Sequence, residues 1–143
     1  MLYPILIIIL IAFIYLAAVI FPKTQDQRGK FLGTAIHGLI DEYLLAHTDH
    51  DLEKKRLRLH KLTVSTDRVL SQVLAHFGTR DSSVKQQLRS ALERNIVTYD
   101  QFRTLKQFHH MRNEVVHEGL QVYGENEQVI YGALIVLKNL INH

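Results

Sequence analysis

The sequence predicts an all-α protein in which a single N-terminal transmembrane helix precedes an antiparallel bundle of four or five helices. The first 21 residues are almost wholly apolar and carry no charged side chain. The remainder carries apolar residues three and four positions apart, which is the spacing of amphipathic helices. No window shows the sustained alternation of apolar and polar residues that is typical of a strand.

Composition narrows the class of protein further. A chain of 143 residues favours one domain. The absence of cysteine excludes a disulfide scaffold, thiol catalysis and any Cys-ligated metal site. Seven glycines and two prolines are too few for a turn-dense all-β fold. The net charge of +3 and the pI near 9.2 are compatible with a polyanionic partner.

Residues 1–21 are expected to form the membrane anchor. The segment 2–21 contains 20 residues without a charge, reading LYPILIIILIAFIYLAAVIF. As a helix it spans about 30 Å, the thickness of a hydrocarbon core. Tyr3 and Phe21 suit the two interfaces, and Pro4 falls in the first turn, where its missing N–H is tolerated.

Two other interpretations of this segment fit the sequence less well. A cleaved signal peptide has basic residues before a shorter apolar run, and here no Lys or Arg precedes the run. A buried core helix would rarely be apolar on every face over this length. Since Lys23, Arg28 and Lys30 follow the span, the positive-inside rule places the rest of the chain in the cytoplasm. The chain is therefore expected to be a single-pass protein of the bacterial inner membrane.

Residues 22–32 are polar and are expected to form a juxtamembrane linker, and residues 33–143 the bundle. Apolar spacing predicts helices over about 32–44, 48–77, 81–92, 98–119 and 126–141. Two of these have capping-box start signals, Thr48 with Asp51 and Thr98 with Gln101. Gly78 and Gly119 are the expected stops.

The residues that indicate chemistry are Arg112, Asn113 and His117, late in the fourth predicted helix. Asn113 and His117 are four apart and therefore project from one face, and the long side chain of Arg112 can reach the same place. A histidine can move protons in phosphodiester cleavage. An arginine can hold the phosphate and stabilise developing charge. Because the 2′-OH of RNA supplies the nucleophile, neither a metal nor a cofactor is expected.

The spacing Arg112-Asn113-(x)3-His117, followed by Glu118-Gly119, resembles the signature of HEPN domains (higher eukaryotes and prokaryotes nucleotide-binding). The resemblance implies a four- or five-helix bundle that dimerises and brings two motifs into one cleft. Many members are metal-independent endoribonucleases of toxin–antitoxin and phage-defence systems, and others are inactive binding modules. It implies that Arg112 stabilises the phosphate, that His117 is the catalytic histidine, and that Asn113 is the polar residue after the arginine. The implied partners are RNA, a second copy, and an antitoxin or regulatory protein.

Further RNA-contacting candidates are weaker. They comprise a basic run on the second predicted helix and two adjacent histidines, namely Lys54, Lys55, Arg56, Arg58, Lys61, His109 and His110. A basic run on a long helix is more often a solvated face. Adjacent histidines point to different faces, which favours ordinary surface or boundary positions for both. The alternatives to a ribonuclease are a non-catalytic HEPN-like module that binds a nucleotide or a protein, and a purely structural oligomerisation domain.

Overall fold

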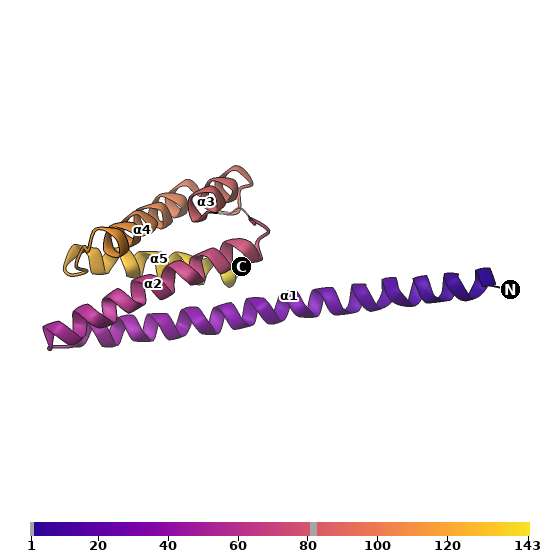
Figure 1. Ribbon diagram of the computed structural model, residues 1–143, viewed down its shortest axis with the longest axis horizontal. Helices are drawn as coiled ribbons and strands as arrows, with labels where there is room; N and C mark the ends of the chain where they lie inside the picture. The colour runs from indigo at the N-terminus through magenta and orange to yellow at the C-terminus, as the bar shows by residue number, and fades with distance from the viewer. Residues whose placement is uncertain (1, 81–82) are drawn as a thin grey trace.

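The computed structural model describes the backbone of residues 2–80 and 83–143, and within the N-terminal helix it describes the side chains of residues 9–15, 17 and 25 onward. The described chain contains five α-helices and no strand, so the all-α prediction is confirmed (Figure 1). The helices are α1 Leu2–Thr48, α2 Leu52–His76, α3 Val84–Glu93, α4 Tyr99–His117 and α5 Glu125–Ile141.

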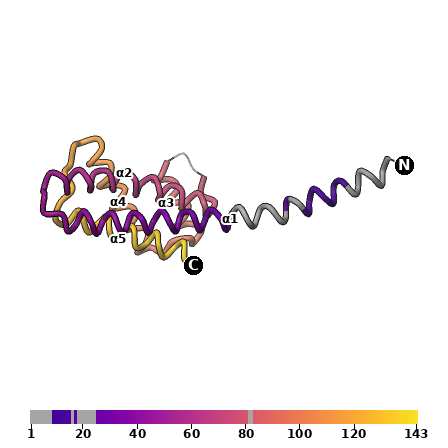
Figure 2. Tube along the Cα trace, turned by 90° about the horizontal axis from the view of Figure 1, so that it is seen from below, coloured from indigo at the N-terminus to yellow at the C-terminus, as the bar shows by residue number. Residues whose placement is uncertain are grey.

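The helices form a bundle, and α1 extends beyond it toward the N-terminus (Figure 1). Residues 9–15 of α1 lie clear of the bundle (Figure 2). α1 and α2 form an antiparallel hairpin, and α4 and α5 form a second one (Figure 1). α2 contacts each of the other four helices, whereas α1 contacts α2 and α5. The segment 22–32, expected as a linker, lies within α1, which runs through it without a break.

The core is built from the apolar stripes that the sequence pattern predicts. Ile36 of α1, Leu70 of α2, Leu88 of α3, Phe108 of α4 and Leu134 of α5 are each almost fully buried. Every helix therefore contributes to one apolar cluster. Burial of such side chains is the main favourable term that holds the bundle together.

The start of α4 is as the sequence predicts. The Thr98 hydroxyl accepts a hydrogen bond from the Gln101 backbone N–H at 3.2 Å, and the Gln101 side-chain oxygen accepts one from the Thr98 N–H at 2.9 Å. This capping box satisfies two N–H groups that a helix start leaves without partners. Gly119, with φ near +70°, follows the end of α4 in the left-handed region that glycine favours.

The capping box predicted at Thr48 is wrong. Thr48 is the last residue of α1, and its hydroxyl donates to the Leu44 carbonyl oxygen at 2.9 Å. The N-cap of α2 is Asp51, whose carboxylate accepts from the Glu53 and Lys54 N–H groups. Asp51 therefore starts α2 without help from Thr48, which is already committed to the preceding helix.

The predicted membrane anchor lies only partly within the described side chains, since those of residues 2–8, 16 and 18–21 are outside them. Over the part of the chain that is described, no helix combines the length and the apolar character needed to cross a membrane.

A buried carboxylate joins the ends of three helices. Glu127, in the first turn of α5, is 5% exposed. Its carboxylate lies 2.9 Å from Nδ1 of His47 on α1 and 3.2 Å from Nζ of Lys55 on α2. Burial alone would raise the pKa of Glu127, but the hydrogen bonds and charges of His47 and Lys55 outweigh it and lower that pKa. Burial and the nearby Glu127 carboxylate raise the pKa of Tyr43, which stacks on Tyr131.

We expect Glu127→Gln to lower the free energy of unfolding at neutral pH by about 1–3 kcal/mol, because it removes the charge that Lys55 faces. A carboxyl group with a lowered pKa stabilises the fold fully above its unfolded value near 4.5, and that contribution is lost as the pH falls through the lower folded value. The difference between parent and variant should therefore shrink below pH 4.5. Urea denaturation of both proteins across this range checks it, and a difference that does not change with pH contradicts it.

Candidate functional site

The candidate motif occupies the C-terminal half of α4. Arg112 and Asn113 are half-buried against the bundle, whereas His117, the last residue of the helix, is exposed. The imidazole of His117 makes no hydrogen bond or ion pair with any described residue. The motif therefore combines two side chains whose positions are fixed with one imidazole that is free to meet solvent or a ligand.

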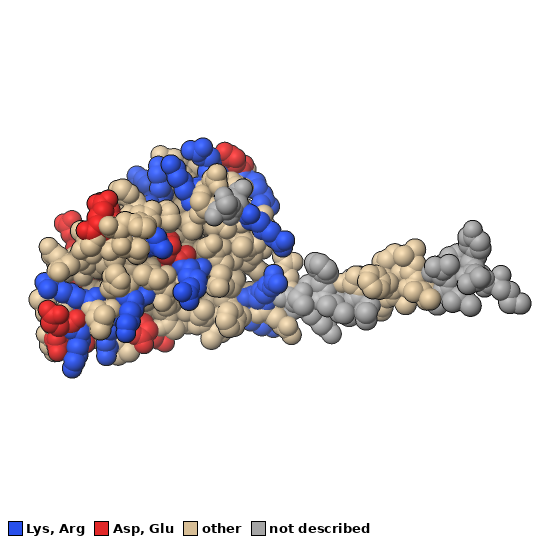
Figure 3. All heavy atoms as spheres, viewed as in Figure 1, with Lys and Arg blue, Asp and Glu red and all other residues tan. Residues whose placement is uncertain are grey.

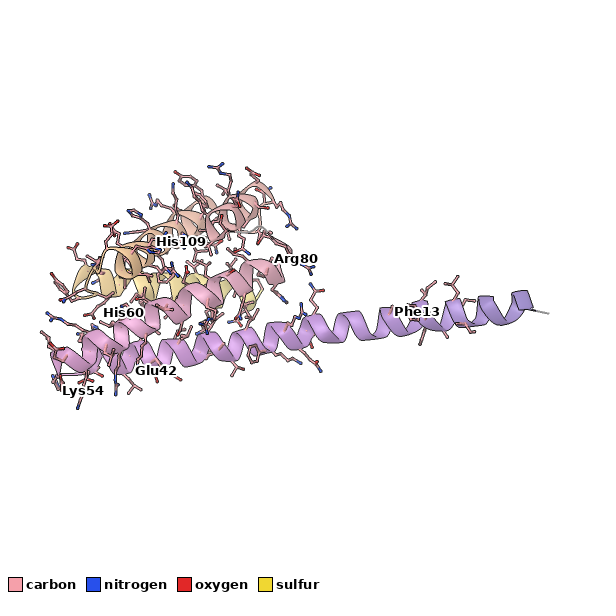
Figure 4. All side chains as sticks on the ribbon, in the orientation of Figure 1. Phe13, Glu42, Lys54, His60, Arg80 and His109 are labelled. Atoms are coloured by element: carbon pink, nitrogen blue, oxygen red, sulfur yellow. The ribbon has the colours of Figure 1, made fainter. Side chains whose placement is uncertain are left out.

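Arg112 is held by a carboxylate from another helix. Asp67 of α2 is 8% exposed, and its Oδ2 lies 3.1 Å from Nε of Arg112. The Nε–H is not aligned for a hydrogen bond, so this contact is a charge pair. The other carboxylate oxygen of Asp67 lies 2.9 Å from Nδ1 of His109. Figure 4 shows His109 on α4, on the side of the bundle where this helix faces α2.

Asn113 closes the network. Its Oδ1 accepts a hydrogen bond from Nη1 of Arg112 at 3.0 Å, and its Nδ2 lies 3.4 Å from Nε2 of His109. The amide nitrogen can only donate, so Nε2 of His109 is the acceptor and Nδ1–H donates to Asp67. Asp67, His109, Asn113 and Arg112 thus form a ring of polar contacts that fixes the orientation of the guanidinium group.

The two adjacent histidines differ in role. His109 belongs to this network and lies at the boundary of the bundle, with its side chain 19% exposed. His110 is 77% exposed and lies 3.8 Å from Glu114. The separation of four residues between His109 and Asn113 is a signal that could have linked them. Asp67 has no comparable local signal, because its partners lie more than 40 residues away in the sequence.

The basic run on α2 is largely paired with carboxylates. Lys55 contacts Glu127, and only Lys61 of the five cations makes no ion pair with a described residue. The other pairs are Lys54 with Asp51 at 3.7 Å, Arg56 with Glu53 at 4.0 Å and Arg58 with Asp49 at 3.8 Å. Figure 3 shows both signs of charge interspersed at this end of the molecule. The run therefore does not present one free cationic face.

A surface hollow of about 390 Å³ lies between α2 and the segment after α4. Leu57 and His60 line it from α2, and Val115 and Gly119 from the other side. Arg112, Asn113 and His117 do not line it. In the described chain no three His, Asp or Glu side chains are grouped closely enough to hold a metal ion.

Comparisons with known proteins do not assign the chain to a family: no family model matches it, and neither a curated protein nor a solved structure shows significant similarity.

Proposed function

We propose that this protein is a membrane-anchored, metal-independent endoribonuclease of the HEPN type, acting as a toxin or a phage-defence effector. The observation that carries the proposal is that the last turns of α4 carry both an Arg112 held by two side chains and an exposed His117 whose imidazole has no partner among the described residues. Asp67 and Asn113 hold the guanidinium group at the two contacts described above. No described residue competes for the imidazole.

In the proposed reaction the 2′-oxygen of RNA attacks the adjacent phosphorus, and the bond from phosphorus to the 5′-oxygen breaks. The products are a 2′,3′-cyclic phosphate and a 5′-hydroxyl end. His117 accepts the proton of the attacking hydroxyl or donates one to the leaving oxygen. Arg112, whose side chain is 25% exposed, stabilises the charge that develops on the phosphate oxygens. Each of these roles follows from the side-chain chemistry and needs no cofactor.

A second copy of the chain is part of the proposal, because one chain alone does not surround the motif. Val116, between Asn113 and His117, is 40% exposed, and Leu57 on α2 is 56% exposed. Tyr123, after α4, is 62% exposed. These apolar side chains at the motif's end of the bundle favour a contact with a partner that would bring two motifs together.

We expect Val116→Arg to convert a dimer into a monomer and to lower RNA cleavage, because it buries a charge at the proposed contact. The added positive charge does not repel RNA, so a loss of cleavage would not reflect electrostatic repulsion of the substrate. Analytical ultracentrifugation in detergent measures the oligomeric state. Leu45→Arg, at a side chain of α1 that is 55% exposed, is the matched control. A Val116→Arg dimer as stable as the parent contradicts this arrangement.

We further propose that residues 2–21 anchor the protein in the membrane. The described apolar side chains of this part of α1 are exposed. The backbone of residues 9–15, which carry most of them, lies beyond the bundle (Figure 2). Phe13 and Tyr15, for example, are 70% and 73% exposed. Such a continuous exposed apolar surface is unfavourable in water and favours insertion into lipid, with the bundle in the cytoplasm.

A second candidate function is a non-catalytic HEPN-like module that binds RNA or a regulatory protein at the membrane. The observation that favours it is that Arg112 already has two partners within the chain. Incubation of the full chain in detergent micelles with RNA and excess chelator separates the two candidates. Cleavage that is lost in Arg112→Ala supports catalysis. A rise in the melting temperature with RNA but without cleavage supports the binding module.

A further inference from the structure

A basic surface lies at the end of the bundle where α1 leaves it, opposite the end that carries Arg112 and His117. A hollow of about 570 Å³ opens here between α1 and the C-terminal part of α2. Figure 3 shows Lys and Arg side chains gathered at this end, and Figure 4 marks Arg80 there. The lining residues are Arg28, Phe31, Leu32, Gln72, Ala75, His76 and Arg80. We call this hollow the anchor-side groove.

Its two arginines are available to a ligand. Arg28 and Arg80 are exposed, and neither makes an ion pair with a described residue. A third cation, Lys30, is paired with Asp26 at 3.1 Å on the surface of α1. Phe31 also lines the groove, and it is 69% exposed. The groove thus combines two guanidinium groups that pair with no described carboxylate and an aromatic ring that is largely exposed.

We propose that the anchor-side groove binds the headgroup of an anionic phospholipid and so docks the bundle on the membrane surface. The inference rests on the proposed membrane anchor. Arg28 follows Phe21, the end of the apolar segment, by 28 − 21 = 7 residues. On a continuous helix this is about 10 Å, and the headgroup layer of each leaflet is about 5–8 Å thick. An extended arginine side chain covers the remaining distance.

The chemistry of the groove favours a lipid phosphate. Guanidinium groups bind phosphate oxygens with two parallel hydrogen bonds, and two arginines line this groove. Phe31, on the same helix as Arg28, lies about 15 Å beyond Phe21 and therefore on the water side of the headgroup layer. RNA held in this groove would lie at the opposite end of the bundle from His117, so the geometry favours the lipid over the substrate.

The test uses the full chain in lipid nanodiscs and a tryptophan in the groove. The protein contains no tryptophan, so Phe31→Trp introduces the only one. Energy transfer from this residue to a dansyl-labelled headgroup reports whether the groove lies against the lipid. We compare discs of phosphatidylcholine with discs that also contain phosphatidylglycerol. Arg28→Gln/Arg80→Gln is the test variant, and Lys54→Gln/Lys61→Gln, which removes the same charge at the other end, is the control.

We expect transfer to be higher in the anionic discs. The Arg28/Arg80 variant should weaken docking about thirty-fold, since each basic residue near an anionic leaflet contributes about a factor of five. Its transfer should therefore fall to the value in neutral discs, while the Lys54/Lys61 variant keeps the parent's value. Equal transfer in both kinds of disc, or equal loss in both variants, overturns the lipid site while the anchor stands. A chain that is not retained in either kind of disc overturns the anchor and the lipid site together.

Discussion

Replacing His117 by alanine is expected to lower the rate of RNA cleavage by about 10²–10⁴-fold, which is the contribution of a positioned acid–base group. The change should leave the fold intact, because His117 is exposed and makes no hydrogen bond with a described residue. Surface substitutions of this kind usually change the free energy of unfolding by less than about 0.5 kcal/mol. Initial rates on labelled RNA measure the loss, and circular dichroism measures the helix content.

The matched control is His110→Ala, which removes an exposed imidazole from the same helix. Its cleavage rate should stay near that of the parent, since His110 lies outside the motif. If His117→Ala cleaves as fast as the parent, then the catalytic assignment of His117 is wrong.

Asp67→Ala is expected to have the largest effect on stability at the site, lowering the free energy of unfolding by about 2–4 kcal/mol. Asp67 is 8% exposed, and its carboxylate faces both Arg112 and His109. Removal of one partner leaves a desolvated charge and a buried donor without compensation. The guanidinium group also loses the contact that orients it, so the cleavage rate should fall as well. Urea denaturation measures the change in stability.

Asp100→Ala is the control for this experiment. Its carboxylate is 87% exposed and lies 3.8 Å from Arg103, so its removal should change the free energy of unfolding by less than about 1 kcal/mol. A double-mutant cycle of Asp67→Ala with Arg112→Ala should give a coupling energy of about 0.5–3 kcal/mol. An Asp67→Ala protein with the parent's urea midpoint and no coupling contradicts the network.

The apolar spacing of the sequence predicted α2 to α5 and their buried faces, but it did not predict that α1 continues through the polar residues 22–32. Leu59, Leu62, Val69, Leu70 and Val73 are buried on α2 as the stripe indicates. Such a pattern reports directly which face of a helix packs against the core. Helix boundaries were less predictable, because a capping residue acts locally and several candidates compete. Thr98 has the reciprocal partner it needs, whereas Thr48 bonds back into α1 and leaves α2 to Asp51.

The surroundings of the motif could be predicted only in part. Arg112, Asn113 and His117 are close in the sequence and share one helix, so their spacing alone is enough to identify them as one motif. The carboxylate that holds Arg112 comes from another helix, and its position depends on how α2 packs against α4. The contact of Glu127 with His47 and Lys55 likewise joins three helices. Contacts of this kind have no periodicity in the sequence, and only the tertiary packing reveals them.

The most direct test of the account compares two oligonucleotides of one sequence, one of RNA and the other fully 2′-O-methylated. Each is incubated with the full chain in detergent micelles and excess chelator. The proposed mechanism predicts that the RNA alone is cut, leaving 2′,3′-cyclic phosphate ends, because only its 2′-OH can attack the phosphorus. If the folded, dimeric protein cuts neither oligonucleotide, or cuts both, then it is not a metal-independent ribonuclease of the kind proposed.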